Sequence, residues 1–186
     1  MTTQLLRRLF TVKEYNRMVE VGILTKYDRV ELIRGEIVEI SPIGRRHASC
    51  VARLIELFLV RLPQMVIVWP QNPVELDDTS EPQPDVTLLQ RRTDFYASGH
   101  PQPPDILLLI EVSDTTVETD RDVKIPLYAE QGIVEVWLVN INEQCVEVYR
   151  EPTPTGYQNV QKFYRGQTLS IQAFPDINIT LDKVLG

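Results

Sequence analysis

The sequence predicts an α+β fold in which helices flank a mixed β-sheet. Residues 106–112 form an almost unbroken apolar run, which indicates a strand buried on both faces. Apolar residues recur at helical spacing over 47–62, and short alternating stretches lie between turn signals elsewhere. The resulting order is helix, hairpin, helix, several strands, helix and further strands, which is typical of α+β architecture.

The length and composition fit one ordinary domain over residues 1–186. Hydrophobic residues make up 43% of the chain and charged residues 24%, as in soluble globular proteins. The longest apolar runs are far shorter than the roughly 20 residues that cross a bilayer, and the first ten residues lack a signal-type apolar segment. We therefore expect a cytoplasmic protein with no membrane partner. Cys50 and Cys145 show no paired CxxC spacing, so both are expected to be ordinary buried thiols.

Capping and turn signals define the first half of the chain. Thr11 stands at an N-cap position with Glu14 three residues later and Gly22 at the end, which predicts a short helix. Two alternating runs over 29–40 surround Arg34-Gly35 and predict a tight hairpin that brings the strands of Glu31 and Glu36 together. The helix over 47–62 is expected to cover one face of the sheet.

The second half of the chain is richer in strands. We expect short strands at 65–69 and 74–76, then a strand that opens at Asp85. The Pro-rich loop over 91–105 is long enough to suggest a function, such as lying over a site.

The sequence after the apolar run predicts one more helix and several strands. A helix is expected from about Asp120 to Gln131, followed by strands at 134–139 and 145–149. Residues 151–186 are expected to add further strands at the edge of the sheet, as a C-terminal β extension.

The charged residues give evidence both against and for nucleic-acid binding. The net charge of −7 argues against nonspecific attraction to phosphates. Three arginine pairs, Arg7-Arg8, Arg45-Arg46 and Arg91-Arg92, could line a groove or belong simply to the solvated surface.

Two acids stand beside apolar strands, and this is the main chemical signal in the chain. Glu111 interrupts the apolar run, where an ionised carboxylate is costly to bury without compensation. Asp85 precedes a second apolar stretch. Hard cations such as Mg²⁺ or Mn²⁺ prefer oxygen ligands, so Asp85, Glu111 and the backbone carbonyl of Val112 could hold one ion. Lys124 could then orient a water molecule or steady the charge of a phosphate.

The same residues resemble a known nuclease pattern. Pro84-Asp85, Glu111-Val112-Ser113 and Lys124 look like the PD-(D/E)XK signature, although the commonest version has its lysine where this chain has Ser113. Residues 111–139 resemble the Uma-type bacterial family of restriction endonucleases, in which the lysine has migrated to the helix. Residues 10–15, 28–42 and 83–86, together with His47, agree with this family, so the resemblance covers roughly residues 10–150.

The resemblance implies a restriction-endonuclease-like fold and a DNA endonuclease that depends on Mg²⁺ or Mn²⁺. It implies Asp85 and Glu111 as metal ligands, Lys124 as the catalytic lysine and Glu31 as an auxiliary acid. His47 matches a family position without an assigned role. Since cutting both strands is simplest for a symmetric pair of subunits, a homodimer is a further expectation.

Each site residue also has an ordinary structural explanation. Asp85 could be a turn residue, Glu111 could mark where its strand reaches solvent, Lys124 could pair with Asp120 along a helix, and Glu31 could face outward from its hairpin. The alternative function is a catalytically silent module of the same fold that binds nucleic acid or protein. The combination of Asp85, Glu111 and Lys124 favours the enzyme. The net charge of −7 does not indicate which substrate it would act on.

Overall fold

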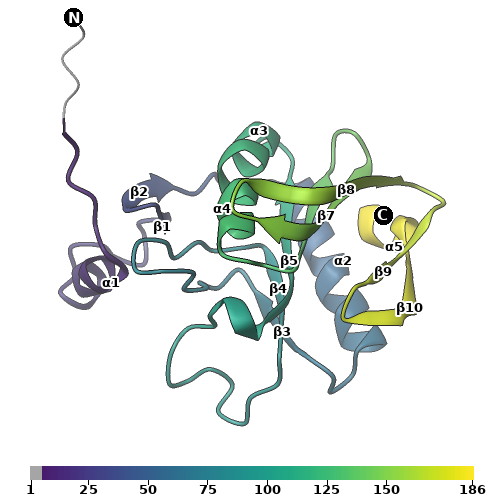
Figure 1. Ribbon diagram of the computed structural model, residues 1–186, viewed down its shortest axis with the longest axis horizontal. Coiled ribbons are helices and arrows are strands. Elements are labelled where there is room, and N and C mark those ends of the chain that lie inside the picture. The colour runs from purple at the N-terminus through teal and green to yellow at the C-terminus, as the bar shows by residue number, and fades with distance from the viewer. Residues whose placement is uncertain (1–5) are drawn as a thin grey trace, which may run out of the picture.

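A six-stranded mixed sheet forms the centre of the protein in a computed structural model that describes residues 6–186 (Figure 1). The strand order is β3-β4-β5-β6-β7-β8, with β5 and β6 parallel and the other neighbours antiparallel. The strands are β3 (Ile67–Pro70), β4 (Val86–Leu89), β5 (Ile106–Ser113), β6 (Glu135–Asn140), β7 (Cys145–Thr153) and β8 (Gly156–Tyr164). The predicted α+β class and mixed sheet are confirmed.

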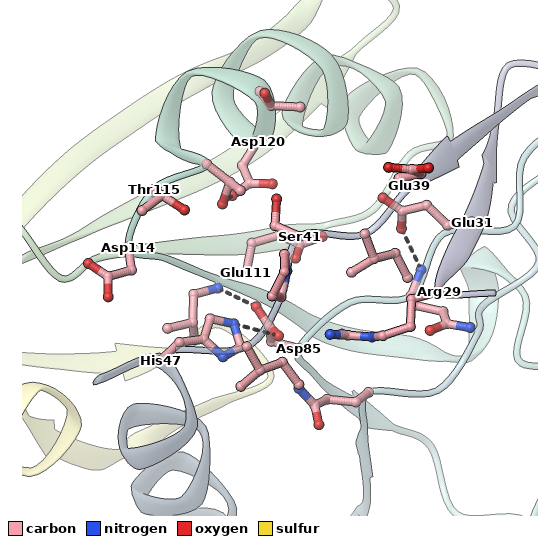
Figure 2. Close-up of a pocket in the computed structure, with 18 of the residues that line it drawn as sticks. Arg29, Glu31, Glu39, Ser41, His47, Asp85, Glu111, Asp114, Thr115 and Asp120 are labelled. Carbon is pink, nitrogen blue, oxygen red and sulfur yellow. Dashed lines mark hydrogen bonds and ion pairs between the residues drawn. The ribbon is translucent and has the colours of Figure 1, made fainter. Parts of the chain in front are cut away.

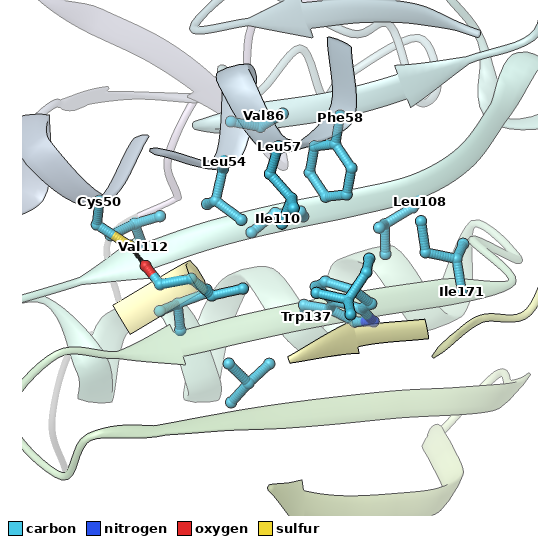
Figure 3. Packing of buried hydrophobic residues seen from close by; sticks show 14 of the residues in the cluster. Cys50, Leu54, Leu57, Phe58, Val86, Leu108, Ile110, Val112, Trp137 and Ile171 are labelled. Atoms are coloured by element: carbon cyan, nitrogen blue, oxygen red, sulfur yellow. Dashed lines mark hydrogen bonds between the residues drawn. The ribbon is translucent and has the colours of Figure 1, made fainter. Parts of the chain in front are cut away.

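Alternation along β5 divides its side chains between two cores. Leu108 and Ile110 face α2 (Arg45–Arg61), whose Leu54 and Phe58 pack on them (Figure 3). Leu109 belongs to the core on the opposite face. Because successive strand side chains point to opposite faces, Glu111 shares the face of Leu109 and points away from α2.

The crossover between the parallel strands β5 and β6 covers the face that carries Glu111. It consists of α3 (Val117–Thr119), a π-helical turn η2 (Asp120–Lys124) and α4 (Ile125–Glu130). The expected helix start at Asp120 was wrong, because the helical run begins at Val117 without a side-chain cap to announce it. Pro126 explains the widened turn, since it has no N–H for the usual bond to residue 122 and its ring crowds that carbonyl.

The N-terminal elements follow their sequence signals. In α1 (Val12–Glu20), Thr11 and Glu14 form the predicted capping box. The hairpin of β1 (Val30–Ile33) and β2 (Glu36–Glu39) turns at Arg34 and Gly35, with φ values of 50° and 79°. Positive φ at both central residues matches the twist of a tight hairpin. A bridge between Leu32 and Glu81 docks this hairpin on the segment that leads to Asp85.

The segment at 74–76 is not the strand that the sequence suggested. Val74 and Leu76 are buried, but their N–H groups donate to the carbonyls of Pro82 and Ser80 within an irregular loop. Prolines before and after this segment supply no N–H groups, so a regular ladder cannot form there.

The C-terminal segment only partly extends the central sheet. β8 is its edge strand, whereas β9 (Thr168–Ile171) and β10 (Phe174–Thr180) form a separate two-stranded sheet. An unexpected helix, α5 (Leu181–Leu185), follows them and packs against α2, where Val184 and Leu181 join the core. Within residues 6–186, the helices are all too short or too polar to cross a membrane.

The long loop over 90–105 lies away from the start of β4. It contains a short 3-10 helix, η1 (Pro103–Asp105), and a buried Tyr96 whose hydroxyl donates to the carbonyl of Gln90. Asp85 precedes β4 whereas the loop follows it, so the four-residue strand, about 13 Å long, separates them. The expectation that this loop lies over the site was wrong.

Candidate active site

A pocket of about 580 Å³ lies where four parts of the fold meet. The end of β5, the residue before β4, the β1–β2 hairpin and the start of α2 surround it, and the crossover helix closes one side (Figure 2). The predicted residues that line it are Glu31, His47, Asp85, Glu111, Val112 and Lys124.

The register between β4 and β5 brings the two strand acids together. Val86 pairs with Ile110, so Asp85 and Glu111 occupy adjacent positions at one end of this antiparallel pair. The N–H of Val112 donates to Oδ2 of Asp85 at 2.8 Å, which fixes that carboxylate against β5. Since the N–H and C=O of one strand residue point to the same side, the carbonyl of Val112 also faces the side of Asp85.

Lys124 lies between two buried carboxylates. Its Nζ is 3.0 Å from Oε1 of Glu31 and 3.3 Å from Oε1 of Glu111. The exposed fractions of Glu31, Glu111 and Lys124 are 4%, 3% and 8%. Burial alone would lower the pKa of Lys124, but the carboxylates of Glu111 and Glu31 outweigh it and raise that pKa above its ordinary value. The amine is therefore a cation at neutral pH.

Glu111 is surrounded by more acids than cations. Burial is the largest cause that raises its pKa well above the ordinary value; Lys124 opposes this, while the carboxylates of Asp120, Asp85 and Glu31 add to it. Glu111 thus does not mark a point where the strand reaches solvent, because its side chain is enclosed. The pocket favours an additional cation beside this carboxylate.

Tyr128 was not among the site residues predicted from the sequence, although it contacts Glu111. Its hydroxyl donates to Oε1 of Glu111 at 2.5 Å, and the whole side chain is buried. Burial raises the pKa of Tyr128 well above its ordinary value, and Glu111 raises it further. The spacing of four residues from Lys124 was the available signal, because it places both on one helix face.

Asp120 is a second missed residue of the pocket. It is buried, and the hydroxyls of Ser113 and Thr116 both donate to its Oδ2, the latter at 2.7 Å. Ser113, which occupies the position of the lysine in the commonest nuclease pattern, thereby supports this acid. The structure places the amine of Lys124 against Glu31 and Glu111, so the simple helix pair with Asp120 does not describe it.

His47 enters the pocket from the first turn of α2. Its Nε2 lies 2.9 Å from Oδ1 of Asp85, and this hydrogen bond raises the pKa of the imidazole above its ordinary value. Its Nδ1 is buried without a hydrogen-bond partner among the described residues. Glu36, by contrast, is exposed and pairs with Arg7 at 2.6 Å, outside the pocket lining.

The donor set of the pocket fits a hard divalent cation. Asp85 and Glu111 supply carboxylate oxygens on adjacent strands, and the carbonyl of Val112 faces the same side. Six carboxylates line the pocket and outnumber its three basic side chains, those of Arg29, His47 and Lys124. This excess of negative charge is what a bound divalent ion would compensate.

Another acidic cluster lies outside this pocket. In the described part of the chain, the ligand atoms of Glu143, Cys145 and Glu147 alone form a group of three such side chains within 4.8 Å of one another. Arg121 and Lys162 already lie 2.5 and 3.0 Å from Oε1 of Glu147. Burial would raise the pKa of Glu147, but Arg121, Tyr149 and Lys162 lower it below its ordinary value. The cluster is therefore explained by its own ion pairs.

Comparisons with known proteins show the family of the chain. The model of the Uma2 family, described as "Putative restriction endonuclease", matches residues 12–182. The chain belongs to the Uma2 family. The match runs past residue 150, where the resemblance in the sequence was expected to end, and includes most of the C-terminal segment.

A solved structure supports the fold of this Uma2 protein. The chain is similar to a "putative nuclease belonging to DUF820" from Anabaena variabilis, with a TM-score of 0.72 and 16% sequence identity. The likeness covers 95% of this chain and 97% of the other. No curated protein matched the sequence. The chain therefore shares its fold with this solved structure.

Proposed function

We propose that this chain is a metal-dependent endonuclease that hydrolyses phosphodiester bonds in DNA. The observation that carries the proposal is the meeting of Asp85, Glu111 and Lys124 in one pocket, with the lysine amine 3.3 Å from the Glu111 carboxylate. The family description and the name of the solved relative support a nucleic-acid substrate.

Asp85, Glu111 and the carbonyl of Val112 would hold Mg²⁺ or Mn²⁺. The ion supplies Lewis-acid activation of water and of the phosphate when it is bound. The hydrogen bond from the N–H of Val112 keeps Asp85 in place, and the hydroxyl of Tyr128 orients Glu111. These contacts prepare the ligands before an ion arrives, which reduces the cost of ordering them.

Lys124 would act as a cation rather than as a base. The carboxylates of Glu111 and Glu31 raise the pKa of the amine and keep it protonated in the metal-free protein. The protonated amine can stabilise the negative charge that develops on the phosphate. Glu31 positions this amine, because its Oε1 contacts Nζ while its Oε2 accepts the N–H of Gln83 at 2.9 Å.

Incubation of supercoiled plasmid with Mg²⁺, Mn²⁺ or EDTA tests the proposal. The wild type and Glu56→Gln should cleave with either ion, because Glu56 is exposed on α2 outside the pocket lining. Asp85→Ala should not cleave. Cleavage that persists in Asp85→Ala, or in EDTA, would show that another site or a contaminant is responsible. Direct conversion to linear plasmid would support a homodimer, whereas nicking alone would argue for a single active subunit.

The net charge of −7 keeps the catalytically silent module as the second candidate. In such a module, the contacts of Lys124 with Glu31 and Glu111 would serve only to hold the fold. This candidate predicts a stable, correctly folded wild type that binds nucleic acid or protein and leaves plasmid uncut with every divalent ion.

A further inference from the structure

A second pocket, of about 280 Å³, lies beside the start of α2 and concentrates positive charge. Four arginines line it: Arg45, Arg46, Arg53 and Arg165. The chain as a whole carries a net charge of −7, so four guanidinium groups around one hollow stand out from the rest of the molecule. We call it the arginine pocket.

The positive charge of the arginine pocket is only partly compensated. Arg46 lies 3.3 Å from Asp114, and Arg165 lies 3.7 Å from Asp182, with all four side chains partly exposed. Within residues 6–186, Arg45 and Arg53 have no carboxylate partner. Two guanidinium groups are therefore without an ion-pair partner in the described part of the chain.

Neutral acceptors hold Arg53 in place. Its Nη1 donates to Oγ of Ser49 at 2.7 Å, and its Nη2 donates to the carbonyl of Leu185 at 2.9 Å. These contacts come from α2 and from α5, which lie side by side (Figure 1). They fix the direction of the guanidinium group without cancelling its charge, which is the arrangement that recognition of an anion requires.

The first turn of α2 also carries the wrong charges for helix stability. Gly44 provides no side-chain cap, and the turn contains no acid but holds Arg45, Arg46 and His47. Cations at a helix N-terminus oppose the helix dipole, whereas an anion there is stabilised by it. An anionic ligand beside this turn would remove the conflict.

The arginine pocket adjoins the candidate active site. His47 contacts Asp85 in the active-site pocket, and Asp114 lines that pocket while it pairs with Arg46. Arg46 and His47 are consecutive residues of α2, and they line the arginine pocket and the active-site pocket respectively. One strand of nucleic acid that enters the active site would therefore pass the arginine pocket.

We propose that the arginine pocket binds a backbone phosphate of the nucleic acid next to the bond held in the active site. This inference rests on the proposed function, because that function supplies the strand. A backbone phosphate would supply Arg45 and Arg53 with a negatively charged partner, and its oxygens accept hydrogen bonds from guanidinium groups. A free phosphate ion shares this chemistry, so the experiment must separate the two sources.

The test measures the affinity for a short labelled duplex by fluorescence anisotropy across a series of salt concentrations, in EDTA. Each lost phosphate contact lowers the slope of log affinity against log salt by about 1. We expect a drop of up to about 1 for Arg45→Gln, and about 1 in all for Arg45→Gln combined with Arg53→Gln, because both guanidinium groups serve one phosphate. The side chain of Arg45 is exposed and makes no hydrogen bond or ion pair with residues 6–186, so its single variant should fold normally.

Arg61→Gln is the matched control. It removes the same charge from the last turn of the same helix, about 24 Å from Arg45 along the axis, and should keep the wild-type slope. Equal slopes for Arg45→Gln and Arg61→Gln would overturn the inference, as would a wild type that does not bind the duplex at low salt.

Calorimetric titration with inorganic phosphate shows whether the arginine pocket binds a free phosphate ion instead of a nucleic-acid phosphate. Phosphate binding that is lost in Arg45→Gln, with an unchanged duplex slope, would overturn the nucleic-acid inference in favour of a free-anion site. Because the binding assay excludes metal, its result is independent of cleavage. If the salt slope depends on Arg45 but the protein does not cut plasmid, the phosphate site is supported and the proposed hydrolase activity is wrong.

Discussion

The amine of Lys124 lies 3.3 Å from the carboxylate of Glu111, although the two residues come from a crossover helix and a central strand. The contact is possible because β5 and β6 are parallel, so the chain must cross back over the face that carries Glu111. Glu31 reaches the same amine from the N-terminal hairpin. Three segments distant in sequence thus share one charge network.

Glu111→Gln should abolish plasmid cleavage without unfolding the protein. The substitution removes a carboxylate whose pKa is raised by burial and by neighbouring acids, so the unfolding midpoint in the absence of metal should stay equal or rise. Cleavage should fall by about 10²-fold or more, since a group that organises transition-state charge is lost. Thermal unfolding and plasmid assays on the same preparation check both statements. A soluble variant with wild-type cleavage would contradict the assigned role.

Lys124→Met should destabilise the protein strongly, and Glu111→Gln should partly rescue it. Removing the amine leaves Glu31 and Glu111 buried without their cation, which costs about 3–5 kcal/mol for a broken buried pair. Denaturant unfolding of both single variants and the double variant gives the coupling free energy. Additive losses would show that these two side chains do not interact in the folded state.

Tyr128→Phe should weaken both the fold and the site modestly. The variant loses the hydrogen bond to Oε1 of Glu111, at a cost of about 0.5–1.5 kcal/mol in unfolding free energy. The divalent-ion affinity should also fall, because Glu111 loses the group that orients it. Tyr149→Phe is a suitable comparison, since its hydroxyl bonds a different buried acid, Glu147. Equal ion affinity in the wild type and Tyr128→Phe would show that the Tyr128 hydroxyl does not contribute to metal binding.

The contribution of Glu111 to the stability of the metal-free protein should fall as pH rises above about 4.5, the ordinary pKa of Glu111. A group with a raised folded-state pKa contributes stability below its unfolded pKa and loses that contribution as pH rises through its folded pKa. Glu111→Gln should flatten this dependence in urea unfolding series. Mn²⁺ should stabilise the wild type more at higher pH, because the ion binds the ionised carboxylate. A wild type and Glu111→Gln with parallel pH profiles would contradict the raised pKa.

Much of the site could be predicted because charged residues stand out beside apolar strands. Asp85 precedes β4, Glu111 lies near the end of its partner strand β5, and Lys124 follows in the crossover, so local pattern and resemblance pointed to the pocket that the structure contains. Their catalytic roles remain predictions. The hairpin and α1 were also predictable, since their turn and cap residues act locally.

The remaining features depend on contacts that sequence pattern does not encode. Tyr128 has the spacing of a core residue, and only tertiary packing turns its hydroxyl toward Glu111. The π-helical turn and the irregular segment around Val74 and Leu76 follow from prolines that remove backbone donors. α5 is too short for a clear helical period, and its position depends on packing against α2.

Calorimetric titration of Mn²⁺ into the wild type, Asp85→Asn, Glu111→Gln and Glu56→Gln would test the shared metal centre most directly. We expect one ion per chain in the wild type and in Glu56→Gln, and no binding in the two pocket variants. Equal Mn²⁺ binding in all four proteins, or none in the wild type, would contradict this expectation.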